Sequence, residues 1–145
     1  MMEQAEDNGL ADLPVGTVRE LRWTIRAADV DAFAALSGDF NPLHVDDDYA
    51  RSQGFPSRVA HGFLLGAKVS ALVGMALPGR RCLLLDQTLS YPAPMHVGDD
   101  VTLTGTVVTQ HEEMGLIDVK LRATVMRDGK VTTVARGKAT CKILF

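Results

Sequence analysis

The sequence has few cysteines, no surplus of basic residues and no apolar run long enough to cross a membrane. Its two cysteines, Cys82 and Cys141, are too few for a disulfide framework in 145 residues, and their spacing is not that of a metal site. Fifteen Lys and Arg residues against eighteen Asp and Glu residues give a formal net charge of −3. Because binding to a phosphate backbone needs a basic surplus, we do not expect a nucleic-acid-binding protein.

Two further absences bear on where the protein acts. The most apolar run, residues 62–77, contains Lys68 and is shorter than the ~20 residues that a bilayer-spanning helix needs. The first 14 residues are acidic and lack the apolar centre of a secretory signal. The sequence therefore predicts a cytoplasmic protein without membrane partners. It has a flexible tail over residues 1–14 and one domain over residues 15–145.

Alternating apolar and polar residues dominate the second half of the chain, a pattern typical of antiparallel strands with one covered face. An Asp128-Gly129 pair indicates a hairpin turn between the last two strands. Strands are expected within residues 15–25 and over residues 83–91, from 101 onward, 117–125 and 131–143.

Three helices are expected between the first strand and the others. The first covers residues 29–36, with Asp29 as its cap and Gly38 at its end, and the second is a short helix capped by Asp46. Residues 62–77 form the third, which is apolar on nearly every side and so must be surrounded by protein. The predicted fold class is α+β, with a curled antiparallel sheet of about five strands wrapped around a long buried central helix.

One loop between these helices carries an acid and an imidazole. In the run Ser37-Gly38-Asp39-Phe40-Asn41-Pro42-Leu43-His44, Pro42 prevents a continuous helix, so Asp39 and His44 can fold toward one point. A carboxylate beside an imidazole is a general acid–base pair, and Asn41 adds an amide that can orient a neighbour. Taken alone, residues with this spacing are more often ordinary polar groups of a loop.

A second candidate feature is Ala60-His61-Gly62, at the start of the long apolar helix. Backbone N–H groups at a helix N-terminus lack internal partners and carry the positive end of the helix dipole. A ligand oxygen can approach a glycine closely, which is how an oxyanion site is built. On local grounds a tight turn into the helix explains these residues as well.

The run from Phe33 to Ala50, with its Gly38-Asp39-Phe40-Asn41-Pro42-Leu43-His44 core, resembles the signature of the MaoC-like, (R)-specific enoyl-CoA hydratase family. Val59-Ala60-His61-Gly62 and the stretch Tyr91 to Asp99, which ends in Val97-Gly98-Asp99, match the family in order and at compatible spacing. The resemblance extends from about Val15 to the C-terminus. It implies the hot-dog fold, which is the sheet around a helix that the patterns predict independently.

The resemblance also implies an activity, the reversible syn addition of water to trans-2-enoyl-CoA thioesters. Asp39 and His44 would be the catalytic pair, with Asp39 activating water and His44 handling the Cα proton. The Gly62 N–H would polarise the thioester carbonyl. Asn41 and His61 would be substrate-binding residues, with Asn41 also supporting the loop. No metal or redox cofactor is implied. The partners would be acyl-CoA and a second copy of the chain, since family sites are shared between subunits, with the sheets joined edge to edge.

Alternatives remain open at this level. A hot-dog acyl-CoA thioesterase would share the fold and the ligand, and an acyl-thioester-binding subunit without catalysis would share the fold, because fold alone does not decide function. The coenzyme A phosphates call for basic residues near the site mouth. Arg80-Arg81 is one candidate, and the set Arg136, Lys138 and Lys142 is another, although a solvated sheet face is the more common reason for such alternation.

Overall fold

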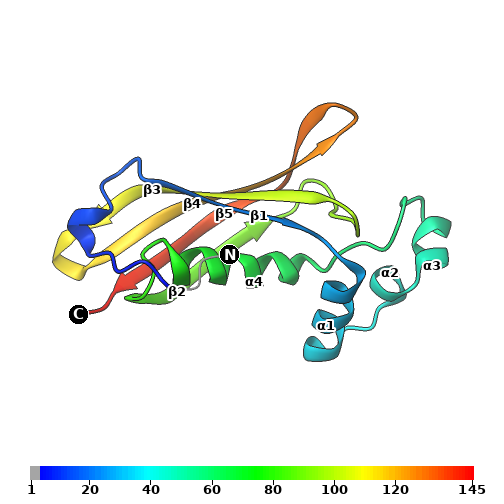
Figure 1. The fold of residues 1–145 in the computed structure, drawn as a ribbon, viewed down its shortest axis with the longest axis horizontal. Helices are drawn as coiled ribbons and strands as arrows, with labels where there is room; N and C mark the ends of the chain where they lie inside the picture. The colour runs from blue at the N-terminus through cyan, green and yellow to red at the C-terminus, as the bar shows by residue number, and fades with distance from the viewer. Residues whose placement is uncertain (1–3) are drawn as a thin grey trace.

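The computed structural model describes residues 4–145 as one five-stranded antiparallel sheet with a long helix against one face (Figure 1). The sheet order is β1-β3-β4-β5-β2. The strands are β1 (Val18–Thr24), β2 (Cys82–Ser90), β3 (Asp100–His111), β4 (Leu116–Arg127) and β5 (Lys130–Ile143). The helices are α1 (Ala27–Ser37), α2 (Pro42–Val45), α3 (Asp47–Ser52) and α4 (Gly62–Met75), with 3₁₀ turns η1 (Leu10–Asp12) and η2 (Glu112–Met114). No helix within residues 4–145 has the length and apolar character needed to cross a membrane.

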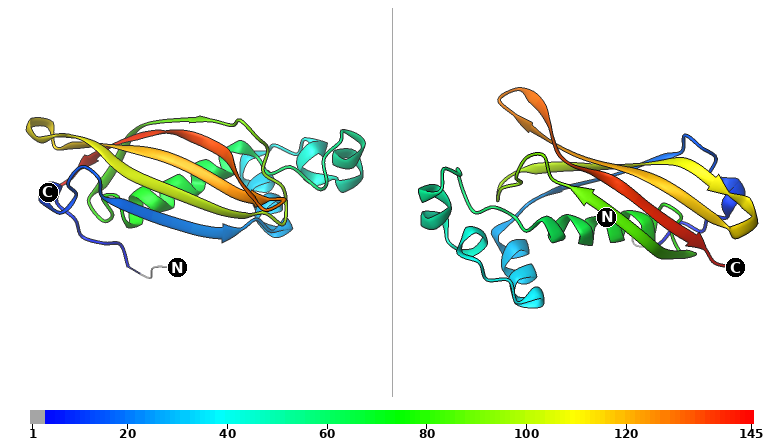
Figure 2. Two further views of the ribbon diagram at one scale, coloured as in Figure 1. Left: turned by 90° about the horizontal axis from the view of Figure 1, so that it is seen from above. Right: turned by 180° about the vertical axis from the view of Figure 1, so that it is seen from behind.

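The predicted strands are confirmed, and their alternation has the expected physical meaning. Along β3, Val101, Leu103 and Val107 are buried, while the threonines between them face outward. The hairpin between β4 and β5 turns at Asp128 and Gly129, whose φ angles of 50° and 74° are those of a two-residue turn that matches strand twist. This hairpin projects beyond the rest of the sheet at one end (Figure 2).

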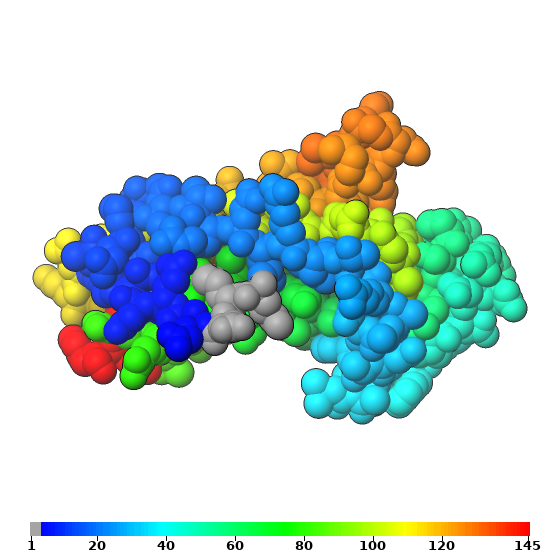
Figure 3. All heavy atoms as spheres, viewed as in Figure 1, coloured from blue at the N-terminus to red at the C-terminus, as the bar shows by residue number. Residues whose placement is uncertain are grey.

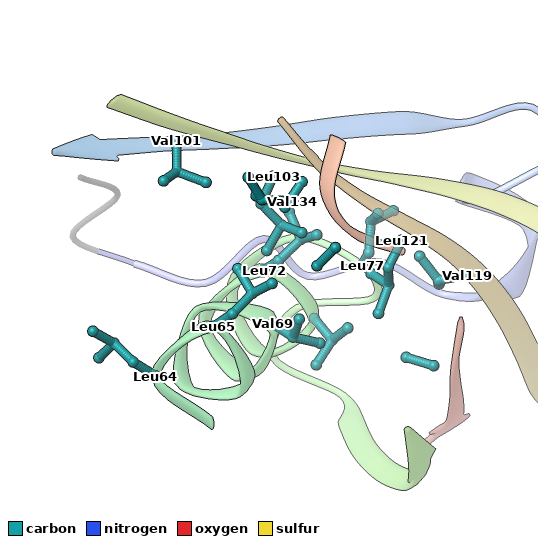
Figure 4. Packing of buried hydrophobic residues seen from close by; sticks show 14 of the residues in the cluster. Leu64, Leu65, Val69, Leu72, Leu77, Val101, Leu103, Val119, Leu121 and Val134 are labelled. Atoms are coloured by element: carbon teal, nitrogen blue, oxygen red, sulfur yellow. The ribbon is translucent and has the colours of Figure 1, made fainter. Parts of the chain in front are cut away.

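The core lies between the sheet and α4. Leu65, Val69 and Leu72 of the helix point toward Leu103 and Leu121 of the sheet, and all five are buried (Figure 4). Gly105 permits this close approach, because a Cβ on that residue would lie only 2.9 Å from a methyl group of Leu72. Burial of such side chains contributes about 1.5–3 kcal/mol each, so this layer is the main source of stability.

Helix α4 is buried along one face only, which corrects the prediction of a helix surrounded by protein. Its opposite face carries Phe63, which is 81% exposed, together with Ala67 and Ser70, which are also exposed. The sheet curls over the helix from one side and does not close around it (Figure 2). The apolar character of the segment was correctly identified, but within a single chain the sheet covers only part of it.

The expectation of a flexible tail does not hold for residues 4–14. The Glu6 N–H donates to the Met75 carbonyl (2.8 Å), and the Glu6 carbonyl accepts from the N–H of Arg80 (2.8 Å). Leu13 is completely buried in the core. Residues 1–3 of the predicted tail lie outside the described residues. The N-terminal segment from Glu6 onward therefore packs against the end of α4 as part of the domain.

Helices α1, α2 and α3 form an overhang at the N-terminal end of α4, seen as the cyan and teal lobe in Figure 3. Gly38 ends α1 with a left-handed φ of 79°, as predicted. The α1 cap differs from the prediction, because the helix starts at Ala27 and Asp29 accepts a hydrogen bond from the Arg26 N–H from within its first turn. The predicted cap role of Asp46 is confirmed at α3.

Candidate active site

The acid and the imidazole predicted to meet do lie together. The Oδ2 atom of Asp39 is 3.6 Å from Nε2 of His44. Asp39 is held by its own loop: its N–H donates to the Ser37 hydroxyl (3.1 Å), and its Oδ1 atom accepts from the N–H of Asn41 (3.1 Å). Pro42 is the first residue of α2 rather than part of the predicted loop, and this short helix carries His44 back toward the carboxylate.

The hydrogen bonding of His44 determines its tautomer. Its Nδ1 atom lies 2.7 Å from the carbonyl oxygen of Val59, and a carbonyl can only accept. The proton of the neutral ring is therefore on Nδ1, and Nε2 presents a lone pair toward Asp39. The half-exposed carboxylate and the largely buried ring thus offer two acceptors that face one small space.

His61 contacts both members of this pair, Asp39 and His44. The ring is 2% exposed and stacks on the ring of His44, with centroids 3.8 Å apart and planes at 24°. The ring of Phe33 also contacts that of His61, with centroids 4.8 Å apart. Its Nε2 atom donates to the backbone carbonyl of Asp39 (3.0 Å), and its buried Nδ1 atom has no partner within residues 4–145. His61 therefore supports the loop through the Asp39 carbonyl, and its expected role in substrate binding stays a prediction.

Asn41 also has a local role in the structure. Its side-chain oxygen accepts from the N–H of Leu43 (2.9 Å) and caps α2, which agrees with the expected loop support. The residue is exposed and does not line the neighbouring pocket, so the expected substrate contact is not visible here.

A pocket of about 410 Å³ opens beside His44. Gly62 lies in its wall, and Asp39 and His61 do not. Within residues 4–145, no acceptor is hydrogen-bonded to the N–H of Gly62, so this donor is available at the positive end of α4. The pocket is mostly apolar and is lined by His44, Phe55, Val59, Ala60, Gly62, Tyr91, Pro92, Ala93, Pro94 and Met95.

Tyr91 is the pocket residue in closest contact with Gly62. Its hydroxyl donates to the Gly62 carbonyl (2.9 Å), and a Cβ on Gly62 would come within 2.9 Å of the ring carbon Cζ. Burial raises the pKa of Tyr91, so the hydroxyl keeps its proton at neutral pH. The ring and the helix terminus therefore form one rigid wall of the pocket.

Asp39, His44 and His61 also form the cluster within residues 4–145 best placed to hold a metal ion, with one ligand atom of each within 4.8 Å of the others. Metal binding requires a lone pair on each nitrogen. The Nε2 atom of His61 carries the proton that it donates to Asp39, so only two of the three groups offer lone pairs. The donor set suits proton transfer better than metal coordination.

Neither basic group predicted for coenzyme A borders this pocket. Arg81 lies beyond the C-terminal end of α4, where its Nε atom pairs with Asp7 at 2.7 Å. Arg136 and Lys138 are exposed on β5, on the outer face of the sheet. The pocket lies at the N-terminal end of α4, so these cations do not belong to the site of the same chain.

The fold and the site together define a hot-dog protein with an acid–base pair overhanging the N-terminus of its helix. Residues 12–132 match the MaoC like domain family model, and the chain belongs to this family. It is 39% identical over 132 residues to the (R)-specific enoyl-CoA hydratase of Rhodospirillum rubrum, covering 91% of this chain and 89% of that enzyme. The resemblance inferred from the sequence motifs is confirmed.

Solved structures agree with this assignment. The (R)-hydratase from A. caviae involved in PHA biosynthesis aligns with a TM-score of 0.85 at 37% identity, covering 90% of this chain and 97% of that one. The R-hydratase PhaJ1 from Pseudomonas aeruginosa aligns with a TM-score of 0.89 at 34% identity, covering 98% and 89%. Both similarities cover at least 90% of this chain, so the predicted hot-dog fold is confirmed.

Replacing Gly62 by Val should lower kcat/KM for an enoyl thioester by about 10²-fold, because the new side chain displaces the Tyr91 ring and narrows the approach to the N–H. Steady-state kinetics with a folded variant measure this. The matched control is Gly74→Ala on the same helix, where nothing lies within 4 Å of the added carbon. Unchanged kinetics for Gly62→Val would exclude a substrate oxygen at this N–H.

Sequence reasoning missed two residues that shape the site, Arg58 and Tyr91. Tyr91 ends a predicted strand and begins the stretch Tyr91 to Asp99 that matches the family, but that match gives it no role at the site and does not indicate its contact with Gly62. Arg58 directly precedes the Val59-Ala60-His61-Gly62 motif. A charge at the entrance to an apolar stretch was a usable signal, because such a residue is buried only when it has partners.

Proposed function

We propose that this chain is an (R)-specific enoyl-CoA hydratase that catalyses the reversible addition of water to trans-2-enoyl-CoA. The proposal rests on one observation above all, the 3.6 Å approach of Asp39 Oδ2 to the unprotonated nitrogen of His44. The identity of 38–39% to two curated (R)-specific enoyl-CoA hydratases over at least 90% of the chain supports it. The same residues act in the reverse direction, as a 3-hydroxyacyl-CoA dehydratase.

The two acceptors suit a water molecule, which has two protons to donate. Asp39 would hold one hydrogen of the water and His44 Nε2 the other, with the oxygen aimed at Cβ. As the O–Cβ bond forms, one O–H bond breaks, His44 receives the proton, and the Cα=Cβ electron pair moves toward the thioester oxygen. His44 then returns the proton to Cα on the same face, which gives syn addition. Asp39, which the resemblance predicts to activate the water, instead orients it and stabilises the transient imidazolium, because the lone pair on Nε2 makes His44 the base.

The negative charge that develops on the thioester oxygen needs a donor. The N–H of Gly62 is free, lies in the same pocket as His44 and is at the positive end of α4. A single donor aimed at a developing oxyanion contributes about 3 kcal/mol to transition-state stabilisation. We assign this role to Gly62. Asn41 and His61 would hold the loop that carries the pair.

The experiment that tests the activity uses crotonyl-CoA. Absorbance of the enoyl thioester should fall with no release of free thiol, and chiral analysis should identify the product as (R)-3-hydroxybutyryl-CoA. A thioesterase would release thiol at the rate of substrate loss. A binding subunit would leave the substrate unchanged while still reducing its free concentration in equilibrium dialysis. Either of these results would refute the hydratase assignment.

We also propose that the active form is a homodimer or a higher homo-oligomer. One face of α4 is uncovered, and Leu83, Leu84 and Leu85 are exposed on the edge strand β2. An exposed apolar edge strand is a template for pairing with another chain, so an edge-to-edge dimer would cover it. Light scattering should give at least twice the 15.7 kDa of one chain, and a mass of one chain would contradict this.

The same proposal extends to the setting of the reaction. Both cysteines carry free thiols, which fits the cytoplasm, where thiols stay reduced. An enoyl-CoA substrate fits a place in fatty acid metabolism. Cell fractionation with an antibody to the chain tests the location directly.

A further inference from the structure

Arg58 is the single buried Lys or Arg within residues 4–145, and its side chain is only 11% exposed. A buried cation is retained only where partners satisfy it, because desolvating an unpaired charge is costly. Arg58 lies four residues before Gly62, in the strand-like segment that leads into α4. It is outside the pocket lining and takes no part in the chemistry described above.

The partners of Arg58 come from all three helices of the overhang. Its Nε atom donates to the backbone carbonyl of His44 (2.5 Å), and its Nη2 atom pairs with the carboxylate of Asp31 on α1. Its backbone N–H donates to Oδ1 of Asp47 on α3 (3.0 Å). One residue therefore ties α1, α2 and α3 to the segment before α4.

The carbonyl of His44 needs this donor. Helix α2 has only four residues, so its carbonyls lack the partners that a longer helix would supply. The N–H of Asp48, which a continued helix would direct at His44, donates instead to Oδ1 of Asp46 (2.9 Å). The guanidinium of Arg58 takes its place and meets the C-terminal end of α2, where a cation is favoured.

We propose that Arg58 is a positioning residue for His44, and that it acts by fixing the main chain of His44 while Val59 fixes its ring. The inference rests on the proposed hydratase function for its kinetic consequence. Two consecutive residues hold the two ends of one histidine: Arg58 bonds the carbonyl oxygen, and the Val59 carbonyl bonds Nδ1. Removing the first contact would free the backbone and let the ring leave its bond to Val59.

The kinetic test compares Arg58→Met, Arg58→Lys and the control Arg51→Met. Arg58→Met keeps the length of the side chain but removes all donors, and kcat should fall by about 10²-fold with little change in KM, because a displacement of about 1 Å costs that much. Arg58→Lys retains the charge and one donor and should recover at least part of that loss. Arg51 lies on α3, is exposed and pairs with no other acid than Asp48 among residues 4–145, so its variant should match the wild type.

A second readout separates positioning from general stabilisation. Long-range ¹H–¹⁵N spectra report the tautomer of His44, which can be assigned from the signal lost in His44→Gln. The wild type should show a single Nδ1-protonated form, Arg58→Met a mixture of tautomers, and Arg58→Lys the wild-type form. Thermal unfolding is measured in parallel, and kinetics are recorded well below the lowest midpoint.

The two roles considered for Arg58, positioning of His44 and general stabilisation, predict different results in these measurements. A lowered melting temperature with kcat per folded molecule and the His44 tautomer unchanged would overturn the proposal and leave Arg58 as a stabilising residue. If Arg58→Met does not fold, the same decision is made with Asp31→Asn, which weakens the hold on the Arg58 guanidinium without removing the cation. A tautomer mixture in Arg58→Met supports positioning even if the wild type hydrates no enoyl thioester, a result that would refute the proposed function alone.

Discussion

Asp39→Asn should lower kcat for crotonyl-CoA hydration by about 10²–10⁴-fold, because the reaction then lacks the carboxylate that holds the water and stabilises the imidazolium of His44. The substitution replaces Oδ2 by an amide nitrogen that donates, and its nearest acceptor is Nε2 of His44, at 3.6 Å in the native geometry. The amide would therefore occupy the lone pair of His44 and displace the water. The remaining side-chain oxygen can still accept from the Asn41 N–H, so the loop should keep its shape.

The measurement is a single-substrate rate assay, with melting temperature recorded for the same samples. Asp48→Asn is a suitable control, because Asp48 lies in the same overhang and its side chain is almost fully exposed. The control should retain wild-type kinetics. If Asp39→Asn hydrates crotonyl-CoA at a rate close to that of the wild type, Asp39 has no part in the mechanism. The chemistry would then rest on His44 and the Gly62 N–H, without a carboxylate.

His44→Gln should lower kcat by a similar factor, about 10²–10⁴-fold, because glutamine cannot accept and return a proton. An amide can still donate to the Val59 carbonyl, which accepts from Nδ1 in the wild type, so the fold should survive. The effects of substituting residues that act as a unit are not additive. The double variant Asp39→Asn/His44→Gln should therefore be at most about tenfold slower than the slower of the two single variants.

The control for this change is His111→Gln. His111 pairs with Asp118 at 3.1 Å at the far end of β3 and does not line the pocket, so its loss should leave turnover unchanged. Multiplicative losses in the double variant would mean that Asp39 and His44 act on separate steps. Loss of folding in His44→Gln, seen by circular dichroism, would return His44 to a structural role.

The sheet could be predicted from the sequence because strand alternation is local and each face of the sheet has one environment. Val101 and Leu103 face the core because every second residue on β3 does so. The extent of burial of α4 could not be predicted in the same way. Phe63 is apolar whether or not this chain covers it, and periodicity does not say whether the covering surface belongs to the same chain.

The meeting of Asp39 with His44 was predictable because Pro42, which lies between them, restricts the backbone and prevents a continuous helix. The residues that support this pair could not be predicted, because their roles depend on contacts between segments that are distant in the sequence. His61 reaches the Asp39 carbonyl and Arg58 the His44 carbonyl, across gaps of 22 and 14 residues. The packing of Glu6 against α4 was equally hidden, since only backbone groups make those hydrogen bonds.

The wall of the pocket formed by residues 92–95 has a practical consequence for protein engineering. Its contact with the segment before α4 is a backbone hydrogen bond, from the N–H of Ala60 to the carbonyl of Met95 (2.8 Å), which side-chain replacements leave in place. Pro92, Ala93 and Pro94 line the pocket but make no hydrogen bond to Asp39 or His44. Substitutions along this wall can therefore change the range of substrates while Asp39 and His44 keep their positions.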